Sequence, residues 1–146
     1  MAEAEHHGVG ALVTNPGRSR FFVQQKDASY PRFPLAYSVF GGARELGEDL
    51  GEAVARELHE ELGASARGIL DAGLVHVLTT RVEPAEGDAF VYSLFEIVVD
   101  DARLDALVEV PVLEGERGAV VTRAELARLP FVWGLEAVVR VYLDGR

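Results

Sequence analysis

The sequence predicts one domain of the α/β (α+β) class, in which helices pack on a mostly antiparallel or mixed β-sheet. Three observations lead to this prediction. The chain has 146 residues, a usual length for one domain, and 49% of them are hydrophobic, enough to form a core. Short β-branched and aromatic runs lie on both sides of a segment with helical periodicity. No repeat or linker divides the chain, so we expect a single domain over residues 1–146.

The first forty residues have the pattern of short strands. Residues 8–14 and 20–26 flank the turn signal Asn15-Pro16-Gly17, which predicts a pair of strands. Residues 27–34 contain two prolines and predict a loop. Residues 36–40 predict a third short strand that ends at Gly41-Gly42.

The helical periodicity is strongest over residues 48–62. Leu50, Val54, Leu58 and Leu62 recur every four residues and form one apolar stripe. Gly63 stands where a helix of this length would end.

The second half begins with a predicted hairpin, formed by strands at 74–82 and 89–99 around a loop at 83–88. A charged connection at 100–105, a strand at 107–113 and a polar loop at 114–118 follow. Thr122 is expected to cap a short helix over 123–129, after which a final helix covers 133–143.

Charge and composition exclude several classes of function. The net charge of -10 argues against a general nucleic-acid binder, which needs a basic face. The absence of cysteine rules out disulfides, thiolate metal sites and a cysteine nucleophile. No apolar run approaches the roughly 18 residues that cross a bilayer. The start of the chain lacks an apolar signal segment, so we expect a cytoplasmic protein with no membrane partner.

Three carboxylates of the 48–62 segment carry the functional argument. Glu57, Glu60 and Glu61 are spaced i, i+3 and i+4, so they project from one side of a helix. They repel one another unless a cation lies between them, and hard oxygen ligands of this kind suit Mg²⁺ or Mn²⁺. Arg56 stands four residues from both Glu52 and Glu60 and can pair with either.

The wider spacing resembles the sequence box of the Nudix hydrolase superfamily, and the chain looks MutT-like. Gly42, Glu48 and the string R-E-L-H-E-E-L-G at 56–63 stand at the positions of the box. The chain departs from the family pattern at Phe40, often proline, and at Ala64, usually a larger aliphatic residue. Neither change removes a ligand. The resemblance implies a Nudix-type α/β/α sandwich with a mixed β-sheet over essentially the whole chain.

The resemblance also implies an activity and a set of roles. The activity would be Mg²⁺- or Mn²⁺-dependent hydrolysis of a nucleoside diphosphate linked to another moiety. Glu57, Glu60 and Glu61 would bind the metal, with Glu48 as an additional or outer ligand. Arg56 would orient these carboxylates.

Other roles remain open. By resemblance, Gly41-Gly42 would bring backbone close to the metal and substrate, and the general base would be Glu60, Glu61 or a glutamate of a later loop, Glu114 or Glu116. Arg20, Gln24 and Lys26 occupy alternate positions of a predicted strand and so lie on one of its faces. There they would contact substrate or simply face solvent. The aromatic residues Tyr30, Phe33, Tyr37 and Trp133 would stack on a base or belong to the core.

Two alternative functions fit the sequence less well. Isopentenyl diphosphate isomerases have a related helix but need a cysteine, which this chain lacks. A catalytically inactive Nudix-like domain that senses a ligand or binds a partner would usually have lost box carboxylates, and here all three are present. The expected partner is a small nucleotide or nucleotide derivative, and the resemblance allows a homodimer.

Overall fold

A mixed β-sheet forms the centre of the computed structural model, which describes residues 6–113 and 117–146. In this part of the chain the strand order is β3-β2-β1-β6-β5, with β4 paired to β1 and β7 to β2. β1 and β6 run parallel and the other pairs are antiparallel, as the prediction of a mixed sheet requires. The strands are β1 (His7–Thr14), β2 (Arg20–Gln25), β3 (Tyr37–Ser38), β4 (Phe40–Ala43), β5 (Val75–Val82), β6 (Phe90–Val98) and β7 (Arg117–Thr122).

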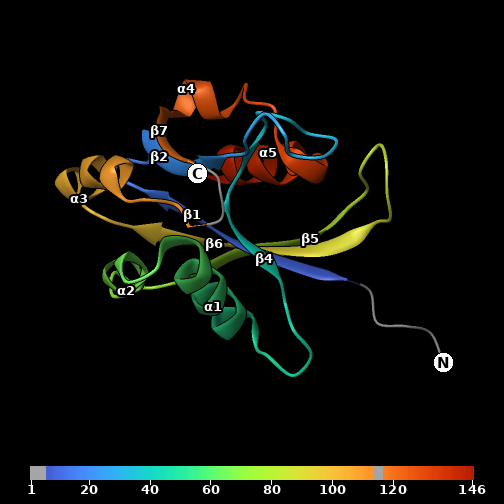
Figure 1. The fold of residues 1–146 in the computed structure, drawn as a ribbon, viewed down its shortest axis with the longest axis horizontal. Coiled ribbons are helices and arrows are strands. Elements are labelled where there is room, and N and C mark those ends of the chain that lie inside the picture. Colours follow the sequence, from blue (N-terminus) through green and yellow to red (C-terminus); the bar gives the residue numbers. More distant parts are fainter. Residues whose placement is uncertain (1–5, 114–116) are drawn as a thin grey trace.

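Helices cover both faces of the sheet, which confirms the predicted α/β/α sandwich (Figure 1). On β1, Val13 packs in one core cluster with Val54 and Leu58, whereas its neighbour Leu12 packs in the other with Val138. This division follows from the two-residue period of a strand. The helices are α1 (Leu50–Leu62), α2 (Ser65–Leu70), α3 (Asp101–Ala106), α4 (Arg123–Leu126) and α5 (Glu136–Gly145), with 3-10 turns η1 (Leu107–Glu109) and η2 (Val132–Gly134).

Helix α1 confirms the main helical prediction, with a start two residues later. Asp49 is the N-cap and accepts a hydrogen bond of 2.8 Å from the amide of Glu52. The helix ends at Leu62, and Gly63 follows with a φ of 60° and an amide that bonds the carbonyl of His59. The buried stripe of α1 packs on the sheet, so its polar side is fixed beside β4.

The prediction that Gly41-Gly42 ends a strand is wrong. Both glycines lie inside β4, where Gly41 pairs with Gly10 and Gly42 with Val9. A Cβ on Gly41 would lie 2.1 Å from the carbonyl oxygen of Val9. Gly41 is therefore needed for the close approach of two backbones, as glycine in a strand often is.

The region after β6 also differs from its prediction. Residues 107–113 do not form a strand, because Leu104 and Leu107 are buried at helical spacing in α3 and η1. The expected charged connection at 100–105 is largely α3, capped by Asp100. Helix α2 and strand β7 were not anticipated. Residues 114–116 of the expected polar loop lie outside the described residues.

Both helices predicted near the C-terminus are present, but their boundaries differ from the predicted ones. Thr122 caps α4 through a reciprocal bond pair with Glu125, as expected, but α4 ends at Leu126. The final helix begins at Glu136, since Trp133 has left-handed backbone angles (φ 54°, ψ 27°) that interrupt it.

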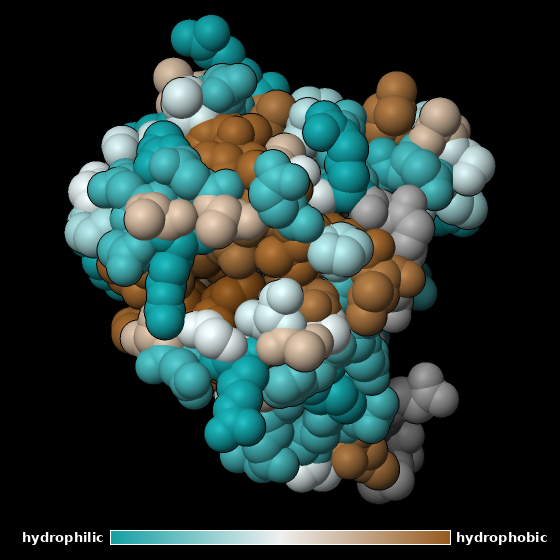
Figure 2. Space-filling model, turned by 60° about the vertical axis from the view of Figure 1, so that its left-hand side comes forward, coloured by the Kyte–Doolittle hydropathy of each residue, from teal (hydrophilic) through white to brown (hydrophobic). Residues whose placement is uncertain are grey.

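Hydrophilic side chains cover most of the face in Figure 2, with hydrophobic ones visible in a hollow between them. Within 6–113 and 117–146, no helix is long and apolar enough to cross a membrane.

Candidate active site

The guanidinium of Arg56 is surrounded by carboxylates. It contacts both oxygens of Glu48 at 2.8 and 3.0 Å, an oxygen of Glu57 at 2.9 Å and an oxygen of Glu60 at 3.2 Å. Its Nη2 also donates to the carbonyl of Ala43 at 2.8 Å, which ties α1 to β4. Hydrogen bonding by Arg56 holds the pKa of Glu48 below its ordinary value. Of the two partners predicted for Arg56, Glu52 and Glu60, the structure shows Glu60. Arg56 also orients three carboxylates.

The carboxylate of Glu57 fills the space that Gly42 leaves open. A Cβ at position 42 would lie 2.5 Å from the carboxyl carbon of Glu57, so any side chain there would displace this group. The side chain of Glu57 is only 14% exposed. The glycine pair therefore places a largely buried acid directly against the backbone of β4.

Glu61 lies deeper, at 4% exposure. Its carboxylate accepts hydrogen bonds from the amide of Gly41 at 2.8 Å and from Nε2 of Gln24 at 2.6 Å. Burial raises the pKa of Glu61 to about 8, the nearby charge of Glu57 adds to this, and the two hydrogen bonds act in the opposite direction. Lys26 donates to Oε1 of Gln24 at 2.8 Å, which fixes the amide so that it presents its NH₂ to Glu61.

The donor set is of the kind that hard divalent cations use, because its atoms are carboxylate oxygens. Glu57 and Glu61 flank Gly41-Gly42, and Glu60 lies on the same side of α1 at 46% side-chain exposure. In the described ranges, no group of three or more His, Asp or Glu side chains is placed to hold a metal ion in the present arrangement. Arg56 now neutralises part of the charge that a cation would neutralise.

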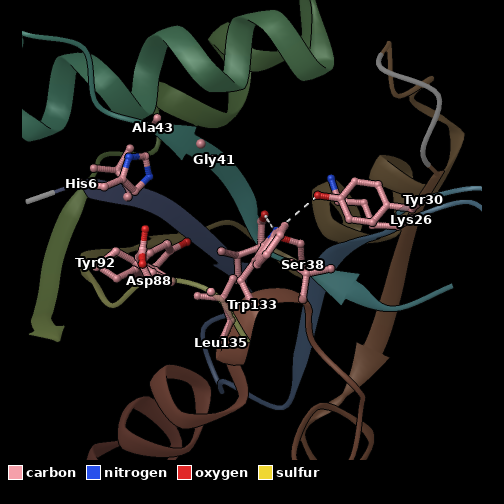
Figure 3. A pocket seen from close by; sticks show the side chains of 17 residues that line it. His6, Lys26, Tyr30, Ser38, Gly41, Ala43, Asp88, Tyr92, Trp133 and Leu135 are labelled. Atoms are coloured by element: carbon pink, nitrogen blue, oxygen red, sulfur yellow. Dashed lines mark hydrogen bonds between the residues drawn. The ribbon is translucent and has the colours of Figure 1, made fainter. Parts of the chain in front are cut away.

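A cavity of about 360 Å³ opens beside the glycine pair, and Gly41 and Gly42 form part of its wall. Figure 3 shows Trp133 in its centre, with Tyr30 and Lys26 on one side and Asp88 and Tyr92 on the other. The carboxylates of α1 and this cavity therefore meet at the same stretch of β4.

The other predicted site residues are distributed differently. Arg20 lies away from this cluster, since its guanidinium binds Asp101 at 2.8 Å and also Asp105, both on α3. Gln24 is buried against Glu61. Glu114 and Glu116 lie outside the described residues. Of the four predicted aromatic residues, Tyr30 and Trp133 line the cavity.

Sequence reasoning missed Glu45, whose carboxylate lies 3.6 Å from Arg56, and the cavity residues Asp88 and Tyr92. One signal for Tyr92 was available. Gly8 and Gly10 alternate within a predicted strand, a pattern that marks the close approach of another group. Nothing local distinguished Asp88 from other residues of a hairpin loop.

The model of the NUDIX domain family matches residues 4–140. The chain belongs to the Nudix family. The match covers nearly the whole chain and includes α1 with its carboxylates. Comparison with curated protein sequences finds no match.

Solved structures agree on the fold. The MutT structures from Aliivibrio salmonicida and Vibrio cholerae include a chain with 21% identity and a TM-score of 0.62, covering 98% of this chain and 100% of that one. A MutT protein from Methanosarcina mazei Go1 has 18% identity and a TM-score of 0.70 over 99% and 96% of the two chains. The dihydroneopterin triphosphate pyrophosphohydrolase of E. coli has 16% identity and a TM-score of 0.69 over 96% of each chain. At these identities the likeness concerns the fold alone.

Proposed function

We propose that this Nudix protein hydrolyses a nucleoside diphosphate linked to another moiety and requires Mg²⁺ or Mn²⁺. The observation that carries the proposal is the meeting of the buried carboxylate of Glu61 and the largely buried carboxylate of Glu57 with the Gly41-Gly42 backbone, which forms part of the wall of a ligand-sized cavity. Such a cavity with convergent polar groups is the usual form of a small-molecule site.

The carboxylate set supports a divalent cation as cofactor. Glu57, Glu60 and Glu61 would hold it. Glu48 lies close to them, because Arg56 binds Glu48 as well as Glu57 and Glu60. A bound Mg²⁺ or Mn²⁺ would supply positive charge to the diphosphate oxygens and act as a Lewis acid. The protein itself has 24 acidic and 14 basic side chains and a net charge of -10, so its own charge does not favour a polyphosphate.

The chain's own residues have separate tasks in this proposal. Arg56 keeps Glu48, Glu57 and Glu60 oriented, and Gln24 does the same for Glu61. Both Glu60 and Glu61 are candidates for the general base, and the late-loop residues Glu114 and Glu116 remain candidates as well.

A hydrolysis assay tests the proposal. The protein is incubated with nucleoside triphosphates, dinucleotides and nucleotide sugars, with Mg²⁺ or Mn²⁺ or with chelator, and the products are separated. We expect turnover that disappears in chelator. Glu57→Gln should lower kcat by about 100-fold or more, because lost electrostatic stabilisation of a transition state costs roughly that much. Glu52→Gln, also on α1, is the matched control and should retain activity.

The inactive-domain alternative predicts a different result. If the wild-type protein released no nucleotide or phosphate from any compound of the panel, the chain would be a ligand-sensing or partner-binding Nudix domain. Calorimetric titration with the same compounds would then still detect binding.

A further inference from the structure

Four polar side chains from three adjacent strands form a continuous hydrogen-bond relay. Nε2 of His7, on β1, lies 2.8 Å from Oγ of Ser93 on β6. The Ser93 hydroxyl lies 2.7 Å from Oγ1 of Thr79 on β5, and this oxygen lies 2.8 Å from Nε2 of His76. Ser93 is fully buried, whereas Thr79 and His76 are exposed. Because β1, β6 and β5 lie side by side, the relay runs from the surface to the first residue of β1 (Figure 1).

The hydrogens of the relay restrict the charge of its two imidazoles. Each hydroxyl has one hydrogen to donate and can also accept one, whereas a protonated imidazole only donates. Every link is filled when one Nε2 donates and the other accepts. If both rings were protonated, both Nε2 atoms would donate, and one hydroxyl hydrogen would have no acceptor in the relay. A complete relay therefore requires at least one neutral ring.

His7 is the ring that its surroundings keep neutral. Its pKa lies below the ordinary value of 6.5, first because of burial and then because of Arg44, His6 and His76. These basic groups come from the residue after β4, from the residue before His7 and from β5, while β6 faces the ring with the hydroxyl of Ser93. A proton on His7 would lie among basic groups, so it is taken up only in acid.

The backbone of His7 holds the loop that leads to α1. Its carbonyl accepts a hydrogen bond of 2.9 Å from the amide of Arg44, the residue after β4. Nη1 of Arg44 donates to the carbonyl of Glu48 at 3.2 Å, and the Glu48 carboxylate binds Arg56. The residues of β1 after His7 are all buried. Release of His7 would therefore loosen residues 44–48 rather than the sheet.

We propose that this relay is a pH-sensitive latch, which holds residues 44–48 against β1 while His7 is neutral and releases them in acid. The inference goes beyond the proposed function, because it concerns the protein without substrate or metal. Since the pKa of His7 is lowered in the folded state, the latch stabilises fully above pH 6.5, the value of the unfolded chain. Its effect is lost as the pH falls from there toward the lowered pKa.

Hydrogen exchange of the Arg44 amide measures the latch directly. The full chain is exchanged in chelator at pH 7.5 and at pH 5, and each rate is corrected for the pH dependence of exchange in an unstructured peptide. We expect the protection of Arg44 to fall by about 3- to 10-fold at pH 5, the range of one neutral hydrogen bond. The amide of Gly63, bonded to the carbonyl of His59, should lose no protection. Local exchange is the right measurement, because the raised pKa of Glu61 changes global stability in the opposite direction.

Two variants of the relay should give different results. His7→Gln cannot titrate, but its amide can still donate to Ser93, so Arg44 should stay protected at pH 5. Ser93→Ala removes the partner of the His7 ring, so Arg44 should be poorly protected at both pH values. Thr80→Val is the matched control on β5, because the Thr80 hydroxyl bonds the carbonyl of Arg81 instead of the relay. It should behave as the wild type does.

Two outcomes would overturn the latch. One is equal protection of Arg44 at pH 7.5 and pH 5 in the wild type, and the other is a wild-type pH dependence in Ser93→Ala. The measurement contains no substrate, so its failure would not affect the proposed function. Failure of the hydrolysis assay would likewise not affect the latch.

Discussion

At the scale of single residues, Gly42 determines where Glu57 lies. Gly42→Ala would place a methyl group 2.5 Å from the Glu57 carboxyl carbon and force that carboxylate to move. We expect a fall in kcat on the order of 100-fold, because a displacement of about 1 Å in a catalytic group costs that much. Steady-state kinetics with the best substrate of the panel measures it. Gly68→Ala in α2, where a Cβ meets nothing within 4 Å, is the control, and equal kinetics for the two variants would contradict the argument.

Glu61 makes stability depend on pH. Its pKa is raised by burial from 4.5 to about 8 in the folded protein, so the folded state holds a proton that the unfolded state has already lost. The stabilising effect is complete below pH 4.5 and is lost as the pH rises to about 8, by up to about 5 kcal/mol in total. Thermal melts in chelator at pH 5 to 8.5 should therefore show a falling Tm.

The comparison that isolates this effect is Glu61→Gln, which cannot titrate. The difference in stability between wild type and variant should shift in favour of the variant as the pH rises. Parallel curves over this range would mean that the folded carboxyl titrates normally.

At the scale of elements, α1 depends on its cap. Asp49 satisfies the amide of Glu52 at the start of the helix that carries the carboxylates. Asp49→Ala should cost about 1 kcal/mol of unfolding free energy, and Asp49→Asn much less, because asparagine also caps well. Urea unfolding followed by circular dichroism measures both, and equal losses in the two variants would show that the carboxylate charge, rather than the cap, matters.

Some helices and strands could be predicted from the sequence and others could not. α1 was predictable because its apolar stripe, its cap and Gly63 all agree over one continuous segment. Residues 107–113 were not, because a short apolar run fits a strand as well as a turn of helix, and only burial of Leu104 and Leu107 against the sheet decides. The glycine pair of β4 was misplaced for a similar reason, since its neighbour Val9 lies more than thirty residues away.

At the scale of the whole molecule, Glu96 joins distant parts of the chain. It is 2% exposed on β6 and accepts two hydrogen bonds from Arg18 of the β1–β2 turn, at 2.8 and 2.9 Å. The hydroxyl of Tyr142 on α5 also donates to it. Burial alone would raise the pKa of Glu96, but the Arg18 and Tyr142 bonds outweigh it and hold the pKa below its ordinary value.

Loss of this carboxylate should destabilise the fold without changing the chemistry. Glu96→Gln leaves Arg18 without its ion partner and should cost about 2–3 kcal/mol, less than a fully buried pair because Arg18 is one-third exposed. Chemical denaturation gives the free energy, with Glu83→Gln on an exposed loop as control. Because Glu96 and its partners do not line the cavity, kcat per folded molecule should stay at the wild-type value; a fall in kcat would mean that the network reaches the site.

By itself, the sequence determined the class of the fold, α1 and the family, because these depend on periodicity and spacing within continuous segments. The orientation of the carboxylates by Arg56 was predictable in part, because residues four apart along a helix lie on the same face. Only the tertiary structure decided that Gln24 meets Glu61, that Arg20 binds α3 and that Tyr92, Asp88 and Trp133 enclose one cavity. These contacts join residues far apart in the chain. Strand pairing and packing bring them together, and no local pattern records which distant side chain will be the neighbour.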